Sequence, residues 1–589
     1  MTAFLIANMA PLMFAALVVF LLLGYPVAFA LAANGIVFGL LGIELGLLSP
    51  SLFGALPERI WGVMSNDTLL AVPFFTFMGL ILERSGMAED LLETIGQLFG
   101  SIRGGLAYAV IFVGALLAAT TGVVAASVIS MGLISLPIML RYGYDRRFAA
   151  GTIAASGTLA QIIPPSLVLI IMADQLGRSV GDMYAGAFIP GIILAGLYAG
   201  YTLLVSFVKP AWVPALPPEA RTLREPDGTT GNQSLLILFV LSTLVGIAFW
   251  HLYYNRLQPE AGIDVRLVVC VSAGTAFAFM AAVINKLTGL GLLSRLAERV
   301  VFVLIPPLAL IFLVLGTIFL GVATPTEGGA MGALGALVMA VGRRRLSMKL
   351  LRQSMDATAK LTTFVVFILI GARVFSLTFY GVDGHKWVEH LLTALPGGQL
   401  GFLIVVNLLV FVLAFFLDFF ELSFIIIPLL APVADKLGID LIWFGVLLAV
   451  NMQTSFMHPP FGFALFYLRS VAPAKEYTDK VTGRRMAPIT TGQIYWGAVP
   501  YVVIQCIMVA LVIAFPQMVM IYKDDAPLND PSKVEIVIPS SDPAQPDPIA
   551  PGKDGAPAGG AVDPLEKALQ DQENADKAGN SLQDDFKQK

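Results

Sequence analysis

The sequence predicts an all-α membrane protein that crosses the bilayer many times, and three observations carry this prediction. Of its 589 residues, 57% are hydrophobic and 13% are charged, whereas about a quarter of the residues of soluble domains are charged. Apolar segments of spanning length recur along the chain, and several are broken by proline. This composition argues against a water-soluble enzyme. The net charge of −4 provides no basic surface for nucleic acid.

The apolar segments follow one another from the first residues onward. The first Lys or Arg is Arg59, so the apolar start lacks the basic region of a signal peptide and is expected to remain as a span. Segments of spanning length lie near 4–23, 26–46, 67–83, 105–140, 184–208, 233–253, 266–285, 300–342, 359–381, 400–435 and 493–522. Two further stretches, 149–173 and 441–470, are cut at their middle by Pro-Pro pairs.

Charge clusters give a partial orientation. Arg141, Arg146 and Arg147 form one basic cluster and 343–352 holds another, and both are expected on the cytoplasmic side. The segments 105–140, 300–342 and 400–435 are each long enough to cross once or twice. The sides of the two termini therefore stay open.

An internal repeat is the most informative feature. Five residues recur at one offset of 295: Pro137, Gly143, Asp145, Pro164 and Pro165 return as Pro432, Gly438, Asp440, Pro459 and Pro460. The repeat predicts two inverted halves, 1–230 and 287–522. Residues 231–286 add two transmembrane segments, and the Pro- and Gly-rich part 523–589 is expected to be a disordered polar tail.

Each Pro-Pro stretch is predicted to form a re-entrant helical hairpin, at about 149–173 and about 441–470. Hairpin tips expose carbonyl groups that suit a monovalent cation, and helix N-termini expose amides that suit a carboxylate. Paired broken segments in two halves are typical of a transporter binding site. The pattern predicts a cation-coupled carrier of a small organic acid, with no cofactor and no catalytic residue.

Polar side chains at membrane depth supply the candidate site residues. The candidates for substrate contact near the Pro-Pro pairs are Ser156, Asn451, Gln453 and Thr454. Arg373 is a candidate for the substrate carboxylate, although it could instead pair with one of the apolar-segment acids Asp418, Glu421 or Glu327. His458 could carry a proton or be a neutral, hydrogen-bonded imidazole.

These motifs resemble a known family, the large membrane subunit of the tripartite ATP-independent periplasmic (TRAP) transporters. The resemblance covers most of 1–520 and rests on four stretches: Gly157-Thr158 through Pro164-Pro165-Ser166, Gly321 through Glu327, Asn66 through Phe75, and Gly438 through Gly445. It implies an elevator-type secondary transporter of the ion transporter superfamily, located in the bacterial inner membrane. Its expected partners are a small four-helix membrane subunit and a periplasmic binding protein that delivers the organic acid.

The resemblance also implies sodium as the coupling ion and two sets of ion ligands. One set is Thr121, Ala160, Ile163 and Pro165, and the other is Asp418, Ser455, His458 and Pro460. The chain departs from the family pattern at 120–122, where Thr-Thr-Gly replaces a Ser-Gly-Ser-like turn, at Ala160, where glycine is common, and at His458. The stretches 418–421 and 456–461 resemble a subgroup associated with 2-oxo acids; dicarboxylates are the other substrate class expected.

Other readings remain open. Gly177-Arg-Ser-Val-Gly181 matches the nucleophile-elbow pattern of a hydrolase, but that motif requires a strand-to-helix turn. No Walker A motif is present, so the chain is not expected to spend ATP itself. A passive channel, a scaffold for other subunits, and a carboxylate carrier that needs no binding protein are the remaining alternatives.

Overall fold

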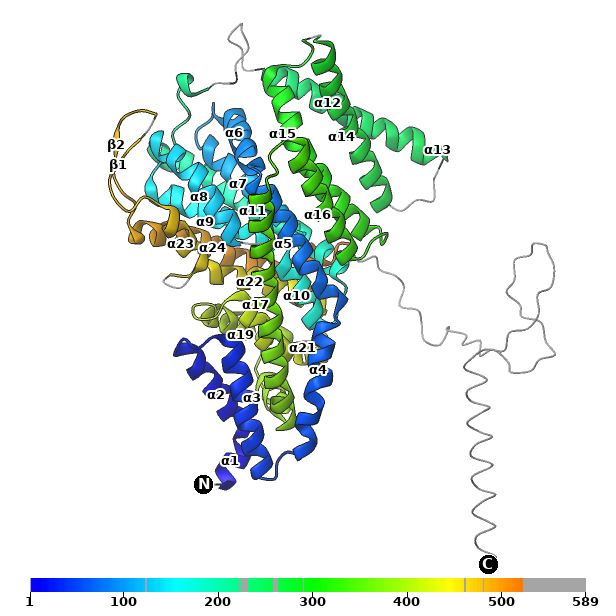
Figure 1. Ribbon diagram of the computed structural model, residues 1–589, viewed down its shortest axis with the longest axis vertical. Helices are drawn as coiled ribbons and strands as arrows, with labels where there is room; N and C mark the ends of the chain where they lie inside the picture. The colour runs from blue at the N-terminus through cyan, green and yellow to red at the C-terminus, as the bar shows by residue number, and fades with distance from the viewer. Residues whose placement is uncertain are drawn as a thin grey trace, which may run out of the picture. The chain divides into compact units, whose positions relative to one another are not determined.

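The computed structural model describes residues 2–121, 124–221, 223, 231–257, 263–289, 291–459, 462–479 and 481–522 (Figure 1). The predicted polar tail lies outside the described residues. Within the described part nearly all regular structure is helical, and eight helices are long and apolar enough to cross a membrane, or up to ten if two bent helix pairs are counted. The predicted all-α polytopic fold is confirmed.

The first elements precede the first set of the five repeated residues. They are α1 (Thr2–Ala7), α2 (Met9–Leu22), α3 (Val27–Glu44), η1 (Pro50–Ala55), α4 (Leu56–Met64), η2 (Asp67–Leu70), α5 (Ala71–Arg84) and α6 (Met87–Phe99). Pro26 precedes α3, where its missing N–H costs no helical hydrogen bond. Gly35 of α3 lies against the backbone of a later helix, because a Cβ there would be 2.7 Å from the carbonyl oxygen of Val374.

The middle of the chain contains the segments predicted as extra at 231–286, followed by the long helices α15 and α17. These are η4 (Pro210–Trp212), η5 (Pro218–Ala220), α12 (Asn232–Phe249), η6 (Trp250–Tyr254), α13 (Asn255–Leu257), α14 (Ile263–Thr288), α15 (Arg295–Phe319), α16 (Pro325–Gly342), α17 (Met348–Gly381) and α18 (Gly384–Thr393). The apolar segment 300–342 is interrupted, since α16 begins at Pro325 and Thr324 caps it. The 34-residue α17 contacts α3, α4 and α5 (Figure 1).

Two groups of helices carry the repeat. The first consists of α7 (Gly105–Thr121), α8 (Val124–Arg141), α9 (Arg146–Thr158), η3 (Leu159–Gln161), α10 (Leu167–Leu176) and α11 (Val180–Val208). The second consists of α19 (Gly398–Leu413), α20 (Phe419–Ile425), α21 (Ile427–Lys436), α22 (Leu441–Met452), η7 (Gln453–Phe456), α23 (Phe463–Val471), α24 (Thr491–Ala514) and α25 (Gln517–Met520). A short antiparallel pair, β1 (Tyr477–Thr478) and β2 (Arg485–Met486), lies between α23 and α24.

The two copies fold alike at the helix starts. Asp145 caps α9, because its Oδ1 accepts hydrogen bonds from the backbone N–H groups of Arg147 and Phe148 at 2.9 and 3.1 Å. Asp440 caps α22 in the same way, with N–H donors two and three residues later at 2.8 and 3.2 Å. In each copy the helix then passes into a short 3₁₀ segment, η3 or η7, before the Pro-Pro pair. The sequence offset therefore marks a repeated local structure.

The stretch α9–α10 does not return to the end at which it enters. The backbone N–H of Asp145, just before α9, donates to the carbonyl of Trp212 at 3.0 Å, four residues beyond the last residue of α11. The last residue of α10, Leu176, lies only four residues before the first residue of α11, Val180. The two ends of α9–α10 therefore lie at opposite ends of α11, a helix of 29 residues.

The stretch α22–α23 behaves in the same way beside α24. Near its start, the indole N–H of Trp443 donates to the carbonyl of Val512 at 3.0 Å, close to the C-terminal end of α24. Near its end, Arg469 donates to the carbonyl of Ile489 at 2.5 Å, just before α24 begins. Both Pro-Pro stretches thus run from one end of a long helix to the other, so the predicted hairpins at about 149–173 and 441–470 are wrong in position.

The chain turns back instead in the segments that precede them. The N–H of Gly104, before α7, donates to the carbonyl of Val213 at 2.9 Å, so α7 starts at the end of the molecule where α8 finishes and Asp145 meets Trp212. In the second copy, Gln399 at the start of α19 donates to the carbonyl of Leu437, directly after α21, at 2.7 Å. The hairpins are therefore α7–α8 and α19–α21.

The physical reason for the correction is length. A 36-residue apolar segment such as 105–140 can cross once as a long helix or return as two, and hydropathy is the same in both cases. The first hairpin has its ends beside 212–213, and the second has its ends near Arg178, whose guanidinium is 3.8 Å from Asp435. They open at opposite ends of α11, the placement that an inverted repeat requires; the repeat as a whole stays a prediction.

Candidate functional site

The breaks in the two Pro-Pro stretches meet inside the protein. The amide Nε2 of Gln453 in η7 donates to the carbonyl oxygen of Thr158 at 2.8 Å and to its Oγ1 at 3.2 Å. Both side chains are buried. The two positions are 295 residues apart, the offset of the repeat. Equivalent positions of the predicted inverted repeat would touch on its two-fold axis, and we therefore take this contact as the centre of the candidate site.

At the break in the first copy, the predicted ion ligands in 160–165 would contribute backbone groups. Ala160 in η3 and the neighbouring Pro165 are buried, and Ile163 is half-buried. Beyond the Pro-Pro pair, Ser166 caps α10 and donates from Oγ to the carbonyl of Gln161 at 2.5 Å. Since the three predicted ligands carry no side-chain oxygen, a cation here would bind carbonyl groups.

The first hairpin approaches this break closely. Ser156, in the last turn of α9, donates to the carbonyl of Thr152 at 2.7 Å, so its hydroxyl proton is already engaged. A Cβ on Gly114 of α7 would be 2.7 Å from the Cβ of Ser156. Thr121 is the last residue of α7, and its side chain lies outside the described part of the chain, as do residues 122 and 123.

The break in the second copy is rich in polar side chains. Asn451 donates from Nδ2 to the carbonyl oxygen of Asn407 in α19 at 2.7 Å and to its Oδ1 at 2.9 Å. Thr454 donates to the carbonyl of Asn451 at 2.7 Å. The Oγ of Ser455 and the Oε1 of Gln453 are buried and have no hydrogen-bond partner in the described part of the chain. A buried oxygen without a partner is costly, so these two atoms suit a bound cation or donor.

His458 fills the space between this break and the second hairpin. Its ring is 1% exposed and lies between Phe411 and Phe415, with ring centroids 4.5 and 4.0 Å away. Neither ring nitrogen has a hydrogen-bond partner among the described residues, although the carbonyl of Ala414 is nearby. Pro460, the next predicted ligand, lies outside the described residues.

The predicted acids Asp418 and Glu327 take part in capping the N-termini of helices. Asp418 lies in the turn of the second hairpin, where its Oδ1 accepts from the N–H of Glu421 at 2.9 Å and its own N–H donates to Glu421 at 3.0 Å. Glu327 makes the matching contact with the N–H of Thr324 at 2.8 Å at the start of α16, where it is exposed. Asp418 lies three residues after Phe415, whose ring packs on His458, whereas Glu327 caps α16 and is not in the site.

Arg373 does not join the break residues, which corrects the predicted grouping. It lies on α17 and lines a separate cavity of about 290 Å³ with Asp174 and Gln175 at the end of α10. The alternative pairing of Arg373 with Asp418, Glu421 or Glu327 is not observed among the described residues.

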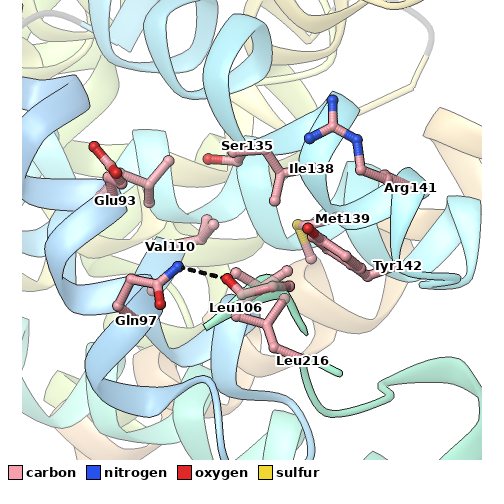
Figure 2. A pocket seen from close by; sticks show the side chains of 13 residues that line it. Glu93, Gln97, Leu106, Val110, Ser135, Ile138, Met139, Arg141, Tyr142 and Leu216 are labelled. Atoms are coloured by element: carbon pink, nitrogen blue, oxygen red, sulfur yellow. Dashed lines mark hydrogen bonds between the residues drawn. The ribbon is translucent and has the colours of Figure 1, made fainter. Parts of the chain in front are cut away.

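A further cavity of about 210 Å³ lies between α6 and the first hairpin (Figure 2). Figure 2 shows Glu93 on one wall and Ser135 and Arg141 on the other. Glu93 pairs with Arg299 at 2.7 Å, and Arg141 pairs with Asp479 at 2.9 Å. The charges of this cavity are already balanced, and it contains none of the predicted site residues.

The stretch Gly177–Gly181, which matches the nucleophile-elbow pattern of a hydrolase, contains a helix N-cap. Ser179, the serine of Gly177–Gly181, lies between two helices and accepts a hydrogen bond from the N–H of Asp182 at the start of α11. The strand that a nucleophile elbow requires is absent from this part of the described chain.

Sequence reasoning missed three residues that shape the second break: Asn407, Phe411 and Phe415. The only available signal was Asn407, a polar side chain within an apolar segment. The two phenylalanines are indistinguishable by type from the lipid-facing residues around them.

Comparison with known proteins gives consistent matches. The family model described as "Tripartite ATP-independent periplasmic transporter, DctM component" matches residues 14–518. "C4-dicarboxylate TRAP transporter large permease protein DctM" of Pseudomonas aeruginosa is 27% identical over 72% of this chain and 82% of its own length. The protein of the same name in Vibrio cholerae is 26% identical over 78% and 89%. "Isethionate TRAP transporter permease protein DctMQ" of Oleidesulfovibrio alaskensis is 23% identical over 80% of this chain and 62% of its own length.

Proposed function

We propose, from the premise that this chain belongs to the DctM family of tripartite ATP-independent periplasmic transporters, that it is a sodium-coupled importer of a small organic acid. The family resemblance found in the sequence is confirmed, and the chain is a multi-pass protein of the bacterial inner membrane. The family is one of transporters rather than enzymes. Sodium coupling, substrate class and mechanism of movement are the proposed parts.

One observation supports the site most directly. The two breaks touch at Thr158 and Gln453, and two buried oxygens beside this contact lack partners in the described chain. Broken helices that meet at depth free backbone carbonyls and amides for ligands, as secondary transporters require. A protein that only anchored other subunits would gain nothing from such breaks.

Sodium fits the available donors. The described residues contain no group of three or more His, Cys, Asp or Glu side chains that could hold a metal ion, so a transition metal has no support. Carbonyl and hydroxyl oxygens are the ligands that transporters use for sodium. The backbone at Ala160, Ile163 and Pro165, with Thr121, would hold one ion. Ser455, Asp418, His458 and Pro460 are the candidates for a second.

The proposed substrate is a dicarboxylate or a 2-oxo acid. Two relatives are named for C4-dicarboxylates and one for isethionate, all small organic anions. Asn451, Gln453 and Thr454, with Ser156, line the meeting point of the breaks and are the proposed contacts. An elevator movement of the two hairpins and breaks past the α3–α5–α17 helices would carry the acid across.

The proposed partners are a small membrane subunit and a periplasmic binding protein. The family is tripartite by description. The isethionate relative is considerably longer than the part that this chain matches. We propose that the small subunit has four transmembrane helices.

The test is reconstitution in liposomes with the partner subunit and candidate binding proteins. Uptake of labelled succinate and pyruvate is expected to be saturable and to require an inward sodium gradient and a binding protein. Equal uptake without sodium would contradict the coupling. Conductance without saturation would indicate a channel, and full uptake without a binding protein would indicate the independent carrier.

Asp418→Asn tests the second ion site. Asn caps helices as well as Asp does, so α20 should keep its start, while the loss of charge should raise the sodium concentration for half-maximal uptake. An unchanged sodium dependence would remove Asp418 from the ion site.

A further inference from the structure

The cavity beside Arg373 lies between two parts of the protein that belong to different helix groups. Its volume is about 290 Å³. One wall is α17, with Arg373 and Ser376, and the other is the end of α10, with Asp174 and Gln175. Phe424 and Pro428 from α20–α21 close the remaining side.

The two charged side chains of this cavity, Asp174 and Arg373, differ in whether they have hydrogen-bond partners among the described residues. Asp174 accepts from the amide of Asn66 at 2.5 Å and from the amide of Gln175 at 2.8 Å. Arg373 is half-buried, and within the described chain it has neither a carboxylate within 4 Å nor a hydrogen-bond acceptor. A partly desolvated guanidinium at membrane depth needs an acceptor. The cavity in front of Arg373 therefore suits an anion.

The position of the cavity relates it to the central site. α17 begins at Met348, inside the basic cluster at 343–352 that is expected on the cytoplasmic side, and Arg373 is about 37 Å further along at 1.5 Å per residue. Asp174 is seven residues beyond the start of α10, or about 10 Å from the break on the same measure. The cavity thus lies on the side of the protein away from the cytoplasm, about 10 Å from the break that precedes α10.

We propose that this cavity is an entry site for the transported carboxylate, with Arg373 as its ligand. This rests on the proposed function. A guanidinium binds a carboxylate through two parallel N–H donors, which fixes its orientation. Ser376 and Gln175 add hydrogen-bonding groups on the two walls. A small mono- or dicarboxylate fits the volume.

Asp174 lowers the affinity of this site for an anion. It is a carboxylate on the opposite wall, and the last carbonyls of α10 add partial negative charge beside it. Both repel a bound acid and compete with it for Arg373. The entry site therefore binds the acid weakly, and the acid passes on to the break instead of remaining at Arg373.

The experiment compares Arg373→Gln, Arg373→Lys and Asp174→Asn in the reconstituted complex, with labelled succinate, or pyruvate if succinate is not transported. Loss of a charge-assisted, two-donor contact is expected to lower kcat/KM in Arg373→Gln by about 10- to 100-fold. At saturation kcat should stay within twofold. Arg373→Lys keeps the charge without the paired donors and should fall between Arg373→Gln and the wild type.

Asp174→Asn separates this role from a purely structural one. Removing the competitor should lower KM and also lower kcat, because the acid leaves Arg373 more slowly. If Arg373 and Asp174 were only a structural pair, both single variants would lose activity and the swap Arg373→Asp with Asp174→Arg would restore it. That result would overturn the proposal.

The control is Lys360→Gln, which removes an exposed cation from the same helix. It should leave kcat/KM unchanged, and all variants should keep the sodium dependence of the wild type. Wild-type uptake without sodium dependence would contradict the proposed function. Sodium-driven wild-type uptake with an unchanged kcat/KM in Arg373→Gln would contradict only the entry site.

Discussion

The contact between Gln453 and Thr158 allows the importance of the joined breaks to be measured. Replacing Gln453 with Met keeps the size of the side chain but removes both donors, at 2.8 and 3.2 Å. The carbonyl of Thr158 is then buried without a donor, which costs about 1–3 kcal/mol. If this contact couples the two halves, that energy corresponds to a roughly 5- to 150-fold loss of uptake per folded molecule.

Asn34→Leu is the matched control. Asn34 is fully buried in α3, donates one hydrogen bond to the carbonyl of Met13 at 3.1 Å, and has an unpartnered Oδ1 among the described residues. Its loss should lower stability by a similar amount without touching the breaks. Thermal unfolding followed by tryptophan fluorescence gives stability, and uptake normalised to folded protein gives function.

The two variants should therefore be alike in unfolding temperature and unlike in uptake. Asn34→Leu is expected to transport within twofold of the wild type. If Gln453→Met transports equally well per folded molecule, the contact serves packing alone and the reasoning about the breaks is refuted.

Two further predictions concern packing and pH. Gly151→Ala should prevent stable folding, because a Cβ there would be 2.0 Å from the carbonyl oxygen of Gly497 on α24, whereas Gly200→Ala meets nothing within 4 Å; equal yields and unfolding temperatures would contradict this. The Arg141 guanidinium holds the pKa of Asp479 well below its usual range. The folded pKa is lowered, so this stabilisation is present above the unfolded pKa of about 4 and is lost as pH falls below it. The difference in unfolding temperature between wild type and Asp479→Asn should shrink over that acid range; a constant difference would contradict the sign.

Local features of the repeat were predictable from sequence because they depend on residue type at fixed spacing. Asp145 and Asp440 cap helices at the same offset, and proline is disfavoured inside a helix but suits its first turn. The break at Pro325 follows from the same rule. These features involve residues only a few positions apart.

The direction of each segment was not predictable, because apolar length is the same for one long crossing and for a hairpin. Contacts between distant residues decide it, such as Gly104 with Val213 and Gln399 with Leu437. The separation of Arg373 from the breaks has the same origin. Its distance from them is set by how α17 packs, and no spacing in the sequence encodes that packing.

The crossing of α9–α10 is the claim on which the site depends, and thiol labelling tests it most directly. Arg147 and Arg178 are both exposed and lie at the two ends of this stretch. Each is replaced by Cys in a background in which Cys270 and Cys506 are changed to Ala. A membrane-impermeant thiol reagent applied to spheroplasts should label Arg178→Cys at once and Arg147→Cys only after permeabilisation. Labelling of both from the same side would show a returning hairpin and contradict the account.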